Sequence, residues 1–285
     1  MTPESVVRST VRAIDHRSTV PRGRSYHRSM PSDDNRSRHV TLFPTCLGTL
    51  LFPRAAEAAE RVLEAAGATV TYVEEDLCCG QPAWNSGHVK DARRVAERAL
   101  DALADADEIV ACSGSCTAMV SHYWVELFEG TPRAAQAQRV AQRTHEFSSY
   151  VAGELGVDNL GPLKTARPRR VAYHDSCHML RGLGISEEPR QLLGAVEGLE
   201  LEDLGAPDRC CGFGGTFSIR FPELSAAMAD EKVDDVSQHE TEELVASDLG
   251  CLMQICGRAR SRSVDFSCRY IAEVLDEAMP QTSHD

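Results

Sequence analysis

The chain has 285 residues, 11 cysteines and a formal net charge of −13. Its contents of hydrophobic residues, 42%, and of charged residues, 26%, are ordinary for a globular protein with one or two cores. The acidic excess disfavours anionic partners, so no nucleic acid is expected to bind. No apolar run reaches the roughly 18 residues that a membrane-spanning helix needs, so no direct membrane insertion is expected.

Residues 1–38 differ from the rest of the chain in charge and in apolar content. They contain eight arginines against four acidic residues and are rich in serine. A segment with so little to bury is predicted to be a disordered basic extension. It has no apolar stretch typical of a secretory signal, and an odd number of cysteines cannot all pair. We therefore expect a reducing cytoplasm, where clustered cysteines are more often ligands or catalysts than disulfides.

From residue 39 onward, hydrophobic runs of strand length alternate with stretches of helical periodicity. In the first half the expected strands are 39–43, 69–73 and 108–112. The expected helices cover 52–66 and 86–104, a third begins near Cys116, and a helical stretch covers 134–154. In the second half the expected strands are 169–174, 199–204, 243–247 and 263–266. Helices are expected there at 222–238, from Cys251 onward and at 267–278.

This alternation predicts an α/β fold. We expect two pseudo-symmetric three-layer-type α/β halves with mostly parallel sheets, produced by an internal duplication. The predicted domains are a first cysteine-rich domain at 39–160 and a second at 168–279, after the extension at 1–38.

The sequence Cys-Cys-Gly occurs twice, at residues 78–80 and 210–212. Adjacent Cα atoms lie about 3.8 Å apart across a trans peptide, less than the roughly 4.4 Å that ordinary disulfide geometry requires. Two adjacent thiolates can instead hold a metal or share a polynuclear cluster, and the glycine leaves the backbone free to adopt positive φ. Each pair therefore predicts metal binding.

Four cysteines of the first half have counterparts in the second half, in the same order. The offsets are 131, 132, 132 and 135 residues, which supports the duplication. Each cysteine follows an expected strand, at the edge where α/β sheets place their sites, so each set should converge. The fourth cysteine of each set also begins a helix, whose N-terminus favours a thiolate. The two sets are Cys46, Cys78, Cys79 and Cys116, and Cys177, Cys210, Cys211 and Cys251.

These spacings resemble the duplicated cysteine-rich (CCG) domain that occurs in heterodisulfide reductase, in the glycolate oxidase iron–sulfur subunit and in the lactate utilisation protein A family. Six stretches match in order: TLFPTC, CCGQPAWNSG, SGSCTAMV, YHDSCHMLRGLG, CCGFGGTFS and SDLGCLMQI. They look most like the last of these families. The resemblance covers about residues 39–278, nearly everything but the extension.

The resemblance implies iron–sulfur binding by the eight matched cysteines, with a [4Fe–4S] cluster, and a role in electron transfer. It also implies a complex with proteins resembling lactate utilisation proteins B and C that oxidises L-lactate to pyruvate. Heterodisulfide reductase holds noncubane clusters with Cys-x-x-Cys at the end of each motif. This chain has Met119 and Gln254 at those positions. Each set thus keeps four cysteines, which suffice for a cubane cluster or for one zinc ion.

Other residues are candidates for a role in these sites. Cys112 and Cys256 lie near the fourth cysteine of each set and are weaker candidate ligands, while Cys268 is expected to pack in a helix. His174 and His178 flank a cysteine of the second set and could donate to a sulfur, bind metal or relay a proton. Packing is an equally expected role for both histidines. The first half has no such pair, which points to the second site as the more reactive one.

The leading hypothesis is an iron–sulfur electron-transfer subunit of an L-lactate-oxidising complex. No flavin or nicotinamide fingerprint is visible, so the chain alone is not expected to be a complete dehydrogenase. Two alternatives stay open. One is a thiol–disulfide reductase resembling the heterodisulfide enzyme, and the other is a zinc-stabilised interaction subunit in which one or both sets are closed tetrahedral sites.

Overall fold

The computed structural model describes residues 38–73 and 77–280. The basic extension expected over residues 1–38 lies outside the described residues, except for Arg38, which begins the first strand. Each half of the chain forms a four-stranded sheet in which all neighbouring strands are parallel. Because parallel strands cannot be joined by a tight turn, helical crossovers separate them.

The two sheets have the same strand order, β2-β1-β3-β4 in the first half and β6-β5-β7-β8 in the second. The first sheet consists of β1 (Arg38–Phe43), β2 (Ala68–Tyr72), β3 (Glu108–Ala111) and β4 (Thr144–Glu146). The second consists of β5 (Lys164–His174), β6 (Glu197–Glu202), β7 (Glu243–Ala246) and β8 (Ser267–Tyr270). The shared order confirms the predicted α/β fold with two similar halves.

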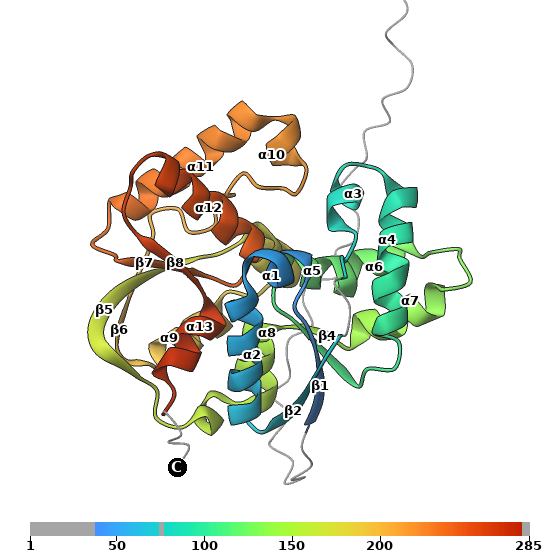
Figure 1. Cartoon of the computed structure of the whole chain (residues 1–285), viewed down its shortest axis with the longest axis horizontal. Coiled ribbons are helices and arrows are strands. Elements are labelled where there is room, and N and C mark those ends of the chain that lie inside the picture. The colour runs from blue at the N-terminus through green and yellow to red at the C-terminus, as the bar shows by residue number, and fades with distance from the viewer. Residues whose placement is uncertain (1–37, 74–76, 281–285) are drawn as a thin grey trace, which may run out of the picture. The chain divides into compact units, whose positions relative to one another are not determined.

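Helices connect the strands and pack on the sheets (Figure 1). The first half contains α1 (Cys46–Leu51), α2 (Pro53–Ala65), α3 (Gln81–Asn85), α4 (Val89–Ala102), α5 (Gly114–Ala118), α6 (Trp124–Leu127), α7 (Ala134–Gln142) and α8 (Phe147–Ser149). The second half contains α9 (Glu187–Gly194), α10 (Phe217–Arg220), α11 (Pro222–Ser237), α12 (Leu249–Ser261) and α13 (Ile271–Ala278). Short π-helical turns cover Met119–Tyr123, Tyr150–Leu155 and His178–Leu183, and a 3₁₀ turn covers Val157–Leu160.

The last strand of each sheet differs from the expected pattern. Strand β4 lies inside the stretch expected to be helical over 134–154. Strand β8 begins at Ser267, whereas the sequence predicts a strand at 263–266 and a helix from 267. Both segments are short and carry polar side chains, so their periodicity is too weak to identify them. Their pairing with β3 and with β7 is what makes them strands.

The halves share one hydrophobic core. The largest cluster of buried side chains combines residues of β1 and α2 with residues of β5, β7 and α13. Helix α2 packs against α13, and the Arg61 guanidinium donates to both oxygens of Asp276, at 2.8 and 2.6 Å, across that contact (Figure 1). Among the residues that the structure describes, no helix is both long and apolar enough to cross a membrane.

Candidate metal centre

The structure brings the four matched cysteines of the first half together. They follow β1, β2 and β3 at the carboxyl edge of the first sheet. The Sγ atoms of Cys79 and Cys116 lie 3.3 Å apart. The thiols of Cys46 and Cys79 lie near the sulfur of Cys78 and act on its ionisation. These contacts connect all four sulfur atoms, and we call this group the first site.

The matched cysteines of the second half form the same arrangement after β5, β6 and β7. The Sγ atoms of Cys211 and Cys251 lie 3.0 Å apart. The thiols of Cys177 and Cys211 lie near the sulfur of Cys210 and act on its ionisation, and this sulfur accepts from the backbone N–H of Gly212 at 3.5 Å. We call this group the second site.

Each site contains one cysteine whose thiolate is strongly favoured. Hydrogen bonds, first from Cys46 and then from Cys79, lower the pKa of Cys78 to about 3. Hydrogen bonds from Cys177 and then from Cys211 lower the pKa of Cys210 to about 2. The first cysteine of each adjacent pair is therefore the sulfur that ionises most readily, as a metal ligand must.

The glycine after each cysteine pair is required by the backbone. Gly80 has a φ of 89° and Gly212 a φ of 82°, which confirms the expected positive φ. A Cβ atom at Gly80 would lie 2.8 Å from the carbonyl oxygen of Ala92, and one at Gly212 would lie 2.6 Å from that of Ser225. Each of these glycines therefore lies close against the backbone of the second helix after it, α4 or α11.

Asp248 joins the two sites and was not identified from the sequence. It is the N-cap of α12, and its Oδ1 accepts from the backbone N–H of Cys251 at 3.1 Å. Its Oδ2 accepts from the backbone N–H of Ser115 at 2.7 Å and from the hydroxyl of Ser113 at 3.1 Å. Ser115 immediately precedes Cys116 of the first site. The aspartate three residues before Cys251 is a signal for the cap, but the sequence contains no signal for the contact with the other half.

The two candidate histidines occupy different environments. His174, the last residue of β5, is fully buried, and neither ring nitrogen has a hydrogen-bond partner among the described residues. Burial, and then the nearby Lys232 ammonium, lowers the pKa of His174 to about 4. His178 lies 3.7 Å from Cys177, measured from Nδ1 to Sγ, and its Nε2 lies 3.3 Å from Nε2 of Gln81 in α3.

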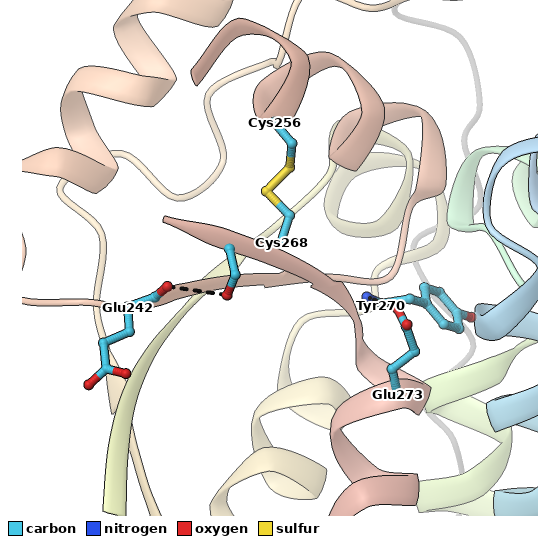
Figure 2. The surroundings of a disulfide bond; sticks show 6 residues. Glu242, Cys256, Cys268, Tyr270 and Glu273 are labelled. Atoms are coloured by element: carbon cyan, nitrogen blue, oxygen red, sulfur yellow. Dashed lines mark hydrogen bonds between the residues drawn. A yellow bond between two sulfur atoms is a disulfide. The ribbon is translucent and has the colours of Figure 1, made fainter. Parts of the chain in front are cut away.

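The remaining cysteines lie outside these groups. Cys112 is fully buried in the shared core, where burial raises the pKa of its thiol. Cys256 of α12 forms a disulfide with Cys268 of β8 (Figure 2). This corrects two expectations. A disulfide sulfur has no thiolate to offer as a spare ligand, and Cys268 lies in a strand rather than in a helix, although it does pack against the hydrophobic core as expected. Sequence separation alone could not indicate that α12 passes over β8.

A family comparison identifies the repeated unit. The model of the cysteine-rich domain called CCG matches residues 40–121 and 171–256. The chain belongs to the CCG cysteine-rich domain family. Both matched CCG segments begin in the first strand of a sheet and contain all four cysteines of one site.

Full-length relatives agree with this assignment. The chain is 43% identical over 238 residues to "Lactate utilization protein A" of Bacillus velezensis, with 83% of this chain and 98% of that protein covered. It is 38% identical over 241 residues to "Lactate utilization protein A 2" of Bacillus cereus, covering 84% and 98% of the two chains. A hypothetical protein from Helicobacter pylori has a similar fold, with a TM-score of 0.61 and 12% identity. The match covers 90% of this CCG chain and about half, 52%, of that one.

The donor set of each CCG site fits a thiolate-bound metal or cluster. Cys79, Cys116, Cys211 and Cys251 are at least nine-tenths buried, whereas the other four matched cysteines are partly exposed. Sulfur atoms 3.0 and 3.3 Å apart need to separate by less than about 1 Å to reach the roughly 3.8 Å that tetrahedral thiolate ligation requires. Four cysteines per site suffice for a [4Fe–4S] cluster or for one zinc ion.

Proposed function

We propose that the chain is an iron–sulfur electron-transfer subunit of a multi-protein system that oxidises L-lactate to pyruvate. The observation that carries this proposal is the convergence of four cysteine sulfurs at the carboxyl edge of each sheet. The names of the relatives refer to lactate utilisation and support the choice of lactate over other 2-hydroxy acids. Under this proposal residues 39–160 and 168–279 each form one cysteine-rich domain.

The cysteines would hold one [4Fe–4S] cluster in each half, the first with Cys46, Cys78, Cys79 and Cys116 and the second with Cys177, Cys210, Cys211 and Cys251. Such a cluster supplies a reversible one-electron store. The protein contributes a dry inner wall, because one cysteine of each adjacent pair and the cysteine of the following helix are buried. The two partly exposed cysteines of each site leave an outer side through which a redox partner can approach.

The partners in this proposal are proteins resembling lactate utilisation proteins B and C. One of them would take electrons from the hydroxy acid, and this chain would receive them. Eight clustered free cysteines suit a reducing compartment, so we place the complex in the cytoplasm, although a disulfide such as Cys256–Cys268 is unusual there.

Metal analysis after anaerobic purification of the full chain tests this proposal. We expect iron and sulfide near four per site, and an EPR signal that appears on reduction with dithionite. Cys210→Ser should remove the iron of the second site, whereas Cys112→Ser, which changes a cysteine outside both groups, should leave iron content unchanged. Zinc without iron after reconstitution would refute electron transfer and support the zinc-stabilised interaction subunit.

A further inference from the structure

His174 and Phe43 occupy equivalent positions in the two halves. Phe43 ends β1 and pairs with Ala111 of β3, and His174 ends β5 and pairs with Ala246 of β7. Both side chains are buried. Phe43 packs in an apolar cluster that includes Cys79 and Cys116 of the first site. The duplicated fold therefore places an aromatic hydrocarbon behind the first site and an imidazole behind the second.

The ring nitrogens of His174 lack hydrogen-bond partners in their described surroundings. Both nitrogen atoms are buried without a hydrogen-bond partner among the described residues. A buried imidazole in this state loses its hydrogen bonds to water without replacement, which is unfavourable. The unpaired ring nitrogens therefore suggest that His174 binds a group absent from the structure.

Two cysteine sulfur atoms of the second site lie near the His174 ring. A ring nitrogen of His174 and the sulfur atoms of Cys211 and Cys251 all lie within 4.8 Å of one another. The nitrogen forms no hydrogen bond to either sulfur, yet it lies close to both. A tetrahedral ion bound by two thiolates and one imidazole needs sulfur–nitrogen separations of about 3.5 Å. Small side-chain shifts would bring the three atoms to that geometry.

We propose that His174 is a nitrogen ligand of the metal held by Cys211 and Cys251, so that the second site has mixed nitrogen and sulfur donors while the first has sulfur alone. The inference rests on the proposed metal binding at the second site. The ring would bind one iron of the proposed cluster, and a borderline-soft divalent cation such as Co²⁺ accepts the same nitrogen and sulfur donors. Because imidazole is neutral and thiolate is negative, each nitrogen ligand lowers the negative charge around the metal. The second site therefore differs from the first in electronic character although the backbone is duplicated.

Cobalt binding to the metal-free full chain tests this ligand directly. The reduced chain is loaded anaerobically with Co²⁺ alone, and X-ray absorption at the cobalt edge counts nitrogen and sulfur neighbours. We expect one imidazole nitrogen for every two cobalt ions in the unmodified chain. Its absence there overturns the proposal, whether or not any variant folds.

Two reciprocal substitutions and one control locate the nitrogen. His174→Phe gives the second site the residue of the first. The variant should lose the nitrogen signal, and its second site should bind cobalt at least about tenfold less tightly than that of the unmodified chain. Phe43→His gives the first site the residue of the second and should raise the nitrogen count. His178→Phe removes the histidine beside Cys177 and should leave the count unchanged. A nitrogen signal that persists in His174→Phe but disappears in His178→Phe would assign the ligand to His178 and overturn the proposal.

This experiment is separable from the test of electron transfer. The cobalt measurement requires neither iron nor sulfide. A nitrogen ligand found in a chain that never assembles an iron–sulfur cluster would support His174 and refute the proposed function. A reducible cluster in a chain whose cobalt form shows no nitrogen neighbour would support the proposed function and refute His174 as a ligand.

Discussion

The carboxylate of Asp248 accepts a hydrogen bond of 2.7 Å from the backbone N–H of Ser115 in the other half of the chain. Its second oxygen accepts from the backbone N–H of Cys251. One buried side chain thus holds the segment that precedes Cys116 and the first turn of the helix that carries Cys251. This carboxylate is one of the contacts that hold the two sites together, beside the backbone hydrogen bond of 2.9 Å from Gly114 N–H to the carbonyl oxygen of Ser247.

Asp248→Ala should destabilise the metal-free reduced chain by about 2–4 kcal/mol, because it removes a helix cap and leaves the partly buried Ser115 N–H without its partner. Urea unfolding measures this change. Asp91→Ala is the matched control, since Asp91 is exposed and its ion pair with Arg94 lies on the same helix, and it should cost less than about 0.5 kcal/mol. Equal effects of the two substitutions would show that Asp248 does not join the halves.

The two sites should lose their metal independently. Cys78→Ser removes the sulfur of the first site whose thiolate is most favoured, and it should reduce the iron content of the reconstituted chain to about half. The EPR signal of the second site should remain. Loss of all iron in Cys78→Ser would mean that the second site cannot assemble without the first.

Glu146 makes stability depend on pH. Its carboxyl group is fully buried in β4, and burial raises its pKa to about 7, although Ser148 and the backbone N–H of Ser149 donate to it. The folded chain therefore keeps a proton that the unfolded chain loses above about pH 4.5, so stability should fall as pH rises from about 4.5 to 7 and then level off. The expected loss is about 3 kcal/mol.

Urea unfolding at pH 5 and pH 8 isolates this contribution. Glu146→Gln has no proton to lose, so its stability should change with pH by about 3 kcal/mol less than that of the unmodified chain. Burial also raises the pKa of Glu243. Because Glu243 is present in both proteins, its contribution to the pH dependence cancels when their stabilities are compared. Identical pH profiles would contradict a protonated Glu146.

The disulfide between Cys256 and Cys268 should stabilise the second half. It closes a short loop between α12 and β8, and the double variant Cys256→Ala with Cys268→Ala should be less stable by about 3 kcal/mol (Figure 2). Reductant should lower the stability of the unmodified chain but not that of the variant. Thiol counting by mass spectrometry should find 9 reactive cysteines of the 11 after unfolding without reductant. Eleven reactive thiols would disprove the bond.

Local sequence patterns were sufficient for the repeat and for the positions of the cysteines. Each cysteine follows a hydrophobic strand, and parallel sheets bring such positions to one edge. Strand β4 could not be predicted, because its three residues Thr144–Glu146 become a strand only by pairing with β3. The hydrogen bond from Ser115 to Asp248 and the Cys256–Cys268 disulfide depend in the same way on how distant segments pack.

The equivalence of His174 with Phe43 shows what sequence offsets can and cannot provide. The offset of 131 between Cys46 and Cys177 already aligns these two residues. Only the structure shows that the His174 ring is fully buried, lacks hydrogen bonds among the described residues and lies against two sulfurs. The signal was therefore present in the sequence, but its meaning depends on the packing around it.

The shared core has a consequence for synthesis of the protein. Helix α2 of the first half buries its apolar face partly against α13, whose last residue is Ala278. During translation the apolar face of α2 therefore stays without this packing partner until α13 has left the ribosome. The apolar cluster around Cys79 and Cys116 contains residues of the first half alone, so we expect the first site to take shape before the shared core is complete.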